Sequence, residues 1–268
     1  MESAPLPVVL SFGGNDPTGG AGLQADIETV ASMGGHAAPV LTTLTVQDTQ
    51  DVMRMGSLDL TLITEQARAV LEDMPVAAIK IGLLGSSEAA EAVHTILVDY
   101  PDIPVVLDPV LASGSGTELA DADLIDAILS LLFPMANVIT PNSLELRNLA
   151  PEADSLDACA QELLETGCDY LLVTGTHENT RHVVNSLYGN KRLLETYQWE
   201  RLPHIYHGSG CTLAAAIAAL LAHGIEPLSA LREAQEYTWE TLRNANRLGM
   251  GQYIPNRFFW TQEGEAGE

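Results

Sequence analysis

Lysine is scarce in this sequence of 268 residues: only Lys80 and Lys191 occur, and basic side chains number 12 against 36 acidic ones. The net charge of -24 argues against nucleic acid or an anionic membrane as a partner, because both would be repelled. A phosphorylated substrate is repelled too, so a phosphate site would need backbone N–H groups and a metal cation. Such acidity suggests a salt-adapted source, since high salt screens repulsion; maximal stability in dilute buffer would contradict that hypothesis.

Cysteine is also rare, and long apolar runs are absent. The three cysteines, Cys159, Cys168 and Cys211, are an odd number without CxxC spacing, which favours a reduced protein without structural zinc. No stretch of about 18 apolar residues occurs, and the N-terminus lacks a basic segment followed by a long apolar run. These absences predict a soluble, cytoplasmic protein with no membrane partner.

Strand-like and helix-like segments alternate almost to the end of the chain, which predicts an α/β fold with a mostly parallel sheet covered on both faces. We assign residues 1–260 to a single domain and residues 261–268 to a polar, disordered tail. The predicted strands are 6–12, 39–46, 76–83, 104–110, 137–140, 170–174, 182–188 and 193–198, the last two antiparallel. The predicted helices are 23–31, 60–73, 88–98, 122–132, 143–149, 156–166, 213–221 and 228–248.

Distinctive loops follow the predicted strands. Ligands of parallel sheets bind at the carboxyl ends of the strands, so these loops should meet along one edge. Lys80 lies within an apolar strand and needs a charged partner there. Residues 112–119 are rich in glycine and serine, which is typical of a mobile flap. The loops expected at the site are 13–22, 47–49, 108–109, 141–145 and 175–177.

The segment from His207 to Thr212 reads as a tight glycine loop that opens a buried, alanine-rich helix. Free N–H groups at the positive end of a helix dipole form an anion site. Gly208, Ser209 and Gly210 would supply these N–H groups, and the side chain of Cys211 would lie beside the anion. The alternative is a glycine-rich turn that only caps a core helix.

Four motifs occur together, at residues 14–26, 80–84, 140–145 and 208–213. In this combination the chain resembles the hydroxymethylpyrimidine/phosphomethylpyrimidine kinases of thiamine synthesis, members of the ribokinase-like superfamily, over about residues 8–258. The resemblance implies a three-layer α/β/α sandwich, ATP and Mg²⁺ as cofactors, a small pyrimidine as substrate, and a homodimer.

The resemblance also implies a role for each motif. Cys211 takes the position of the base, and a thiol at a helix N-terminus has a lowered pKa, so we expect a thiolate. The amides of Gly208, Ser209 and Gly210 would stabilise charge on the transferred phosphoryl group. Glu145 would help to place magnesium. The pyrimidine would be bound by Gly14, Asp26, Gln47, Leu83 and Val110, and the nucleotide by Asn142, Glu145, Thr174, His177 and Thr212.

Plainer interpretations exist for several of these residues. Asp26 and Glu145 could be acids that favour helix starts, and Cys211 could be a small buried residue. His177 and His207 are interpreted as hydrogen-bonding supports rather than catalysts, and Asp108 as part of a turn that shapes the pocket.

The chain lacks lysine at two positions where the family usually has it, Thr174 and Met250. Arg247 or Arg257 could replace the missing charge. Two alternative functions therefore stay open: a kinase for pyridoxal or pyridoxine, and a homologue that binds a pyrimidine without catalysis.

Overall fold

The computed structural model describes residues 6–261, which form one sheet with the strand order β3-β2-β1-β4-β5-β6-β7-β8-β9. Strand β1 (Val8–Asn15) lies between β2 (His36–Gln47) and β4 (Val76–Ile81) and runs parallel to both. The chain therefore leaves β1 in one direction and later returns on its other side, which creates a crevice at the carboxyl ends of β1 and β4.

The sheet continues in parallel through three short, buried strands and ends in antiparallel pairs. The short strands are β5 (Val105–Leu107), β6 (Val138–Ile139) and β7 (Tyr170–Val173). A β8–β9 hairpin follows β7, formed by His182–Gly189 and Arg192–Glu200. At the opposite edge, β3 (Val52–Ser57) pairs with β2, and our sequence analysis did not predict this strand.

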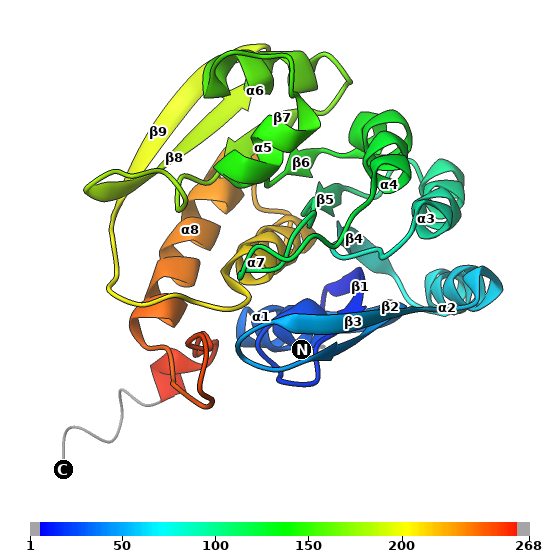
Figure 1. The fold of residues 1–268 in the computed structure, drawn as a ribbon. Helices are drawn as coiled ribbons and strands as arrows, with labels where there is room; N and C mark the ends of the chain where they lie inside the picture. The colour runs from blue at the N-terminus through cyan, green and yellow to red at the C-terminus, as the bar shows by residue number, and fades with distance from the viewer. Residues whose placement is uncertain (1–5, 262–268) are drawn as a thin grey trace, which may run out of the picture.

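Helices cover both faces of the sheet, as Figure 1 shows, so the predicted three-layer α/β/α sandwich is confirmed. Alternate residues of β1 enter two separate cores: Leu10 belongs to one and Val9 to the other. The first core lies under α2 (Leu60–Asp73), α3 (Ser87–Asp99), α4 (Ala122–Ala127), α5 (Ser143–Leu149) and α6 (Leu156–Leu164). The second lies under α1 (Gly22–Ser32), α7 (Ser209–Ala222) and α8 (Pro227–Arg243).

Two predicted helix ends were wrong. The helix predicted over residues 122–132 is α4 followed by a π-helical turn at Ile128–Leu132 and a 3-10 turn at Phe133–Met135. Helix α8 ends at Arg243 rather than near residue 248, and the chain then runs as an extended C-terminal segment, residues 244–258. The predicted tail lies outside the described residues except for Thr261, which closes a short 3-10 turn (Phe259–Thr261).

Helix α7 packs against β4 and β5 between α1 and α8. Its middle is made of small residues, and Ala214, Ala215, Ala216, Ala218 and Ala219 are fully buried. Small side chains let a helix approach a sheet closely, and this approach carries the first turn of α7 to the carboxyl edge of the strands.

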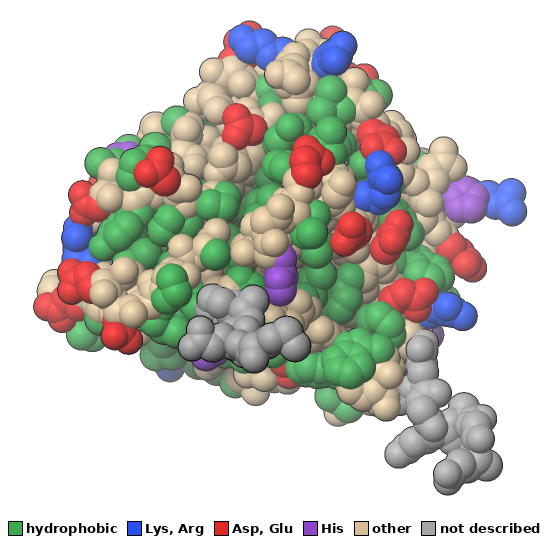
Figure 2. All heavy atoms as spheres, turned by 180° about the vertical axis from the view of Figure 1, so that it is seen from behind, with side chains coloured by type: hydrophobic (Ala, Val, Ile, Leu, Met, Phe, Trp, Pro, Cys, Tyr) green, Lys and Arg blue, Asp and Glu red, His purple; other side chains and the backbone are tan. Residues whose placement is uncertain are grey.

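None of the helices in the described part of the chain is long and apolar enough to cross a membrane. On the face seen in Figure 2, acidic side chains are scattered among neutral and apolar ones, and basic side chains are few. This distribution gives nucleic acid no basic patch on that face.

Candidate active site

The glycine loop of residues 13–22 rests directly on the N-terminus of α7. Gly208 caps this helix with φ +83°, and a Cβ built on it would lie 2.0 Å from the carbonyl oxygen of Gly20. A Cβ on Gly20 would in turn lie 2.3 Å from Cδ2 of the His207 ring. Only glycine fits at these two positions, so the predicted substrate loop and the predicted anion loop form one unit.

The first turn of α7 presents free N–H groups at this contact. The N–H of Thr212 is the first to bond back into the helix, to the Gly208 carbonyl at 2.9 Å. The N–H groups of Ser209, Gly210 and Cys211 precede it and are therefore available to an anion at the positive end of the helix dipole. Our sequence analysis assigns two of these backbone groups, those of Ser209 and Gly210, to an anion, and we call all three the anion cradle.

His207 connects the two loops through its ring. Its Nε2 lies 2.8 Å from Oδ2 of Asp16 and 3.2 Å from the side-chain nitrogen of Gln47. Burial acts to raise the pKa of Asp16, but the hydrogen bond and charge of His207, with bonds from Thr18, outweigh it and lower the pKa. His207 therefore supports the glycine loop through its hydrogen bond with Asp16, as predicted, and Gln47 lies in contact with the same ring nitrogen.

Two of the predicted pyrimidine contacts, Gly14 and Leu83, touch each other, and a third, Val110, follows the next strand of the sheet. A Cβ on Gly14 would lie 3.0 Å from Cδ2 of Leu83, so the two residues pack directly against each other. Leu83 and Val110 are half-buried, and each follows the end of a strand, β4 and β5 respectively. An apolar wall beside open backbone suits the flat face of a heterocycle.

Asp26 lies beneath this wall rather than at its surface. It is fully buried, and its Oδ1 lies 2.9 Å from Nζ of Lys80, which is 1% exposed. Burial raises the pKa of Asp26, but the Lys80 ammonium favours the ionised carboxylate. Burial alone would lower the pKa of Lys80, and attraction to the carboxylates of Asp26 and Asp108 raises it instead. Lys80 therefore has the charged partner that its place in an apolar strand requires.

Our prediction of a Cys211 thiolate was wrong. Burial raises the pKa of the Cys211 thiol to about 12, although the charge of Lys80 acts in the opposite direction. The raised pKa leaves the thiol neutral at physiological pH, and it lies close enough to Asp108 for each group to influence the pKa of the other. Asp108 follows β5 beneath the first turn of α7, where a Cβ on Gly210 would lie 3.7 Å from both of its carboxylate oxygens.

Burial also raises the pKa of Asp108 to about 6, although Lys80 favours its ionised form. The carboxylate is therefore mostly ionised at neutral pH. Its Oδ2 is buried without a hydrogen-bond partner among the described residues. We had interpreted Asp108 as part of a turn that shapes the pocket, whereas the structure brings its charge to the anion cradle.

Asn142 and Glu145 start α5 as a capping box. The Asn142 side chain accepts hydrogen bonds from the N–H groups of Leu144 and Glu145, and Oε2 of Glu145 accepts one from the N–H of Asn142 at 2.9 Å. Burial, together with repulsion by Asp108, raises the pKa of Glu145 to about 8. Two carboxyl groups thus compete for ionisation next to the cradle.

Among the residues predicted to contact the nucleotide, Asn142, Glu145 and Thr174 lie together, whereas Thr212 belongs to α7. Thr212 is buried, and its hydroxyl donates to the Gly208 carbonyl at 2.8 Å. Thr174 joins the end of β7 to α5, since its N–H donates to Pro141 and its carbonyl accepts from Ser143. His177 is exposed in the loop after β7. The structure therefore brings Thr212, but not His177, to the glycine contact.

The segment predicted to be a flap, residues 112–119, closes over the loop between β2 and β3. Hydroxyl groups of Ser113, Ser115 and Thr117 all donate to the carboxylate of Asp51. This loop is also bonded to the C-terminal segment, because the N–H of Gln252 donates to the Thr49 carbonyl at 2.8 Å. Three chain segments thus enclose one side of the crevice.

Comparison with known proteins agrees with this geometry. A sequence profile described as Phosphomethylpyrimidine kinase matches residues 16–256. The chain belongs to this family. The hydroxymethylpyrimidine/phosphomethylpyrimidine kinase of Synechococcus elongatus is 36% identical over 261 residues, which is 95% of this chain and 98% of the relative. The thiamine biosynthesis bifunctional protein ThiED of Geobacter sulfurreducens is 34% identical over 254 residues, 92% of this chain, and the chain spans 52% of its length.

Solved structures confirm the ribokinase-like fold that the resemblance implied. The phosphomethylpyrimidine kinase of Clostridium difficile matches with a TM-score of 0.77 and 30% identity, covering 89% of this chain and 100% of that one. The pyridoxal kinase of Bacillus subtilis, solved as an ADP complex, matches with a TM-score of 0.88 and 26% identity, covering 96% of this chain and 100% of that one.

Sequence analysis underestimated Lys80 and Asp108 as members of the site. A lysine in an apolar strand is itself a signal, because its burial requires a nearby carboxylate. Asp108 was visible as an acid at the end of a buried strand. The sequence did not show that both charges lie under the N-terminus of α7.

We expect the Asp26–Lys80 pair to hold the fold together beneath the substrate loop. Asp26→Ala should lower the free energy of unfolding by about 3–5 kcal/mol, because it leaves a buried ammonium unpaired. The double variant Asp26→Leu/Lys80→Met removes both charges and should lose less than the single variant. Urea denaturation gives the free energy of unfolding of the wild type, the single variant and the double variant. A single variant as stable as the wild type would contradict the buried ion pair.

The neutral Cys211 thiol predicts slow alkylation. Because its pKa is raised to about 12, iodoacetamide should modify Cys211 far more slowly than free cysteine at neutral pH. The rate should keep increasing beyond about pH 10. Peptide mass spectrometry after timed quenching measures it, and a rate that levels off near neutral pH would show a thiolate after all.

Proposed function

We propose that the protein transfers the γ-phosphoryl group of ATP to 4-amino-5-hydroxymethyl-2-methylpyrimidine, to its monophosphate, or to both, in thiamine biosynthesis. The contact between Gly20 and Gly208 carries this proposal, because it places an anion cradle directly against a loop suited to a flat heterocycle. Membership of the phosphomethylpyrimidine kinase family and relatives named for thiamine biosynthesis support it.

In the proposed reaction the pyrimidine lies between the glycine loop and the side chains of Leu83 and Val110, with Gln47 bonding its polar edge. The N–H groups of Ser209, Gly210 and Cys211 stabilise charge on the transferred group. Asp26 does not contact the substrate directly; it pairs with Lys80 beneath the site. Thr212, Thr174 and His177 belong to the nucleotide side of the site.

The proton of the substrate hydroxyl leaves through Cys211. The neutral thiol passes its own proton to the Asp108 carboxylate and accepts the hydroxyl proton on sulfur. A weak relay of this kind is sufficient because the loose transition state of phosphoryl transfer depends mainly on positioning and electrostatics.

The residues around the cradle fit a magnesium ion. Asp108 has a buried oxygen without a hydrogen-bond partner among the described residues, and repulsion between Asp108 and Glu145 helps to raise the pKa of Glu145. A divalent cation prefers oxygen ligands and would relieve that repulsion. Glu145 would help to hold Mg²⁺, which supplies positive charge to the nucleotide phosphates, while Asn142 keeps Glu145 in place and Asp108 stays free to receive the proton.

Lys80 provides the argument against a homologue that has lost catalysis. Threonine and methionine replace the usual family lysines at positions 174 and 250, but the ammonium of Lys80 is attracted to the Asp108 carboxylate under the cradle. Buried charge therefore supports the phosphoryl site from below.

The proposed use of ATP and the three free cysteines support our placement of the protein in the cytoplasm.

A parallel steady-state assay with hydroxymethylpyrimidine, its monophosphate and pyridoxal tests the proposal. We expect phosphorylation of at least one pyrimidine, with a higher kcat/KM than for pyridoxal. The variant Gly208→Ala tests the glycine contact. Its Cβ would collide with Gly20, so kcat should fall about 100-fold or more. Faster turnover of pyridoxal would favour the alternative kinase. In calorimetry, pyrimidine binding without Mg-ATP binding would favour the non-catalytic alternative.

We also propose a homodimer. Leu44 and Val46 on β2 are 45% and 46% exposed, and neighbouring Met53 is 64% exposed, so apolar side chains gather on the hairpin at the edge of the sheet. A second copy would cover them. Light scattering should give twice the chain mass for the wild type and the monomer mass for Val46→Asp. A monomeric wild type would contradict this proposal.

A further inference from the structure

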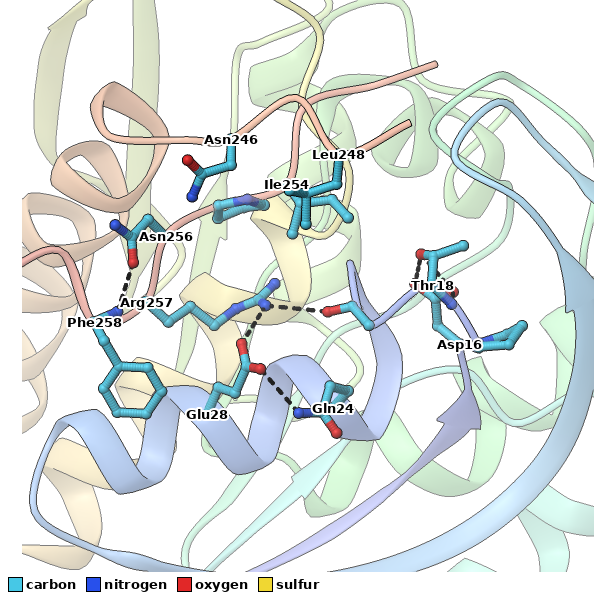
Figure 3. A pocket seen from close by; sticks show the side chains of 13 residues that line it. Asp16, Thr18, Gln24, Glu28, Asn246, Leu248, Ile254, Asn256, Arg257 and Phe258 are labelled. Atoms are coloured by element: carbon cyan, nitrogen blue, oxygen red, sulfur yellow. Dashed lines mark hydrogen bonds and ion pairs between the residues drawn. The ribbon is translucent and has the colours of Figure 1, made fainter. Parts of the chain in front are cut away.

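Arg257 is a fully buried arginine in the C-terminal segment, and it touches both halves of the site. Its Nη2 donates to the Gly20 carbonyl and its Nη1 to the Gly19 carbonyl at 3.4 Å. Its Nε donates to the hydroxyl of Thr212 at 3.0 Å. Figure 3 shows the guanidinium between α1 and the glycine loop. Arg257 also lines a cavity of about 480 Å³.

This arrangement does not suit the role that we considered for Arg257 in the sequence, replacement of a lysine that binds phosphate. Its remaining interaction is an ion pair of Nη1 with Oε2 of Glu28 at 3.0 Å. All three guanidinium nitrogens thus bond to protein groups, and the side chain is 0% exposed. The Arg257 side chain is committed to the protein rather than to a ligand.

We propose that Arg257 is a positioning residue that fixes the distance between the pyrimidine loop and the anion cradle. The inference rests on the proposed function of these two elements. Gly19 and Gly20 have no side chains with which to hold the loop, and Gly19 has φ +75°. The contact of Gly20 with Gly208 prevents closer approach but does not prevent separation. The His207–Asp16 hydrogen bond holds the loop at one point, and a planar guanidinium that bonds two loop carbonyls and the first turn of α7 adds attraction at the glycines themselves.

Arg257 can do this because its own backbone is fixed. Its carbonyl accepts hydrogen bonds from the hydroxyl of Ser32 at 2.6 Å and from that of Tyr237 at 2.9 Å, on α1 and α8 respectively. Earlier in the same segment, the Tyr253 carbonyl accepts a hydrogen bond from the N–H of His207 at 2.8 Å. The C-terminal segment therefore connects the second helical layer to the mouth of the site.

Kinetics of Arg257→Lys and Arg257→Gln test the proposal. Lysine keeps the charge but cannot bond Thr212 and both carbonyls at once, so both variants should resemble each other. We expect KM for hydroxymethylpyrimidine to rise about tenfold or more and kcat to fall, because a charge-assisted hydrogen bond is lost. The KM for ATP should stay within about twofold. Guanidinium ions added to Arg257→Ala should restore part of kcat.

Glu28→Gln is the matched control. It removes the charge of the ion pair but leaves the bonds of Arg257 to Gly19, Gly20 and Thr212, so KM for the pyrimidine and kcat should change little. Variants of Arg257 that only unfold at a lower temperature, with wild-type kcat and KM at 25 °C, would overturn the proposal and leave Arg257 with a purely structural role.

Hydrogen–deuterium exchange separates this inference from the proposed function, because it needs no substrate. In Arg257→Gln, amides of residues 14–24 and of residues 207–214 should both exchange faster, while amides of β5 and β6 stay unchanged. Unchanged exchange in either loop would overturn the positioning role, even in an active kinase. Faster exchange in both, in a protein without kinase activity, would support the role and reject the proposed function.

Discussion

Two glycines in contact, Gly20 and Gly208, determine how the site of this protein is arranged. A Cβ on Gly208 would lie 2.0 Å from the Gly20 carbonyl, so no other residue allows the substrate loop to reach the mouth of α7. Helix α7 can present its first turn there because alanines bring its middle close to the sheet. The anion cradle and the heterocycle loop are therefore positioned by the absence of side chains, and Arg257 ties them together from the other side.

Charge is the second constraint. A chain with a net charge of -24 must attract a polyphosphate, although it contains only two lysines. The structure places one of them, Lys80, beneath the cradle and keeps it protonated through Asp26 and Asp108. Backbone N–H groups provide the rest of the positive potential without side-chain charge. Buried placement matters here, because the attraction between buried charges is screened much less by salt than that between exposed ones.

Much of this could be predicted from the sequence, for definite reasons. The short apolar runs at β1, β4, β5 and β7 predict buried strands by themselves. The spacing of Asn142 and Glu145 predicts the start of α5. Strand β3 was missed because Arg54 and Gly56 interrupt any alternating pattern, and it exists through pairing with β2. The partner of Lys80 lies 54 residues away, and Arg257 lies 237 residues from Gly20. No local pattern records such distances.

Two effects act in opposite directions on the pKa of the Cys211 thiol: the helix N-terminus lowers it and burial raises it. A helix N-terminus stabilises a thiolate by about 2 kcal/mol at most, which lowers a pKa by about 1.5 units. Burial of a charged group shifts a pKa in the opposite direction by up to about 3–5 units. Sequence shows the helix start but not the depth of the sulfur, and in the structure burial prevails, with a pKa of about 12. A residue in the position of a base is thus a neutral donor, and the adjacent Asp108, with a pKa of about 6, is the group able to receive the proton.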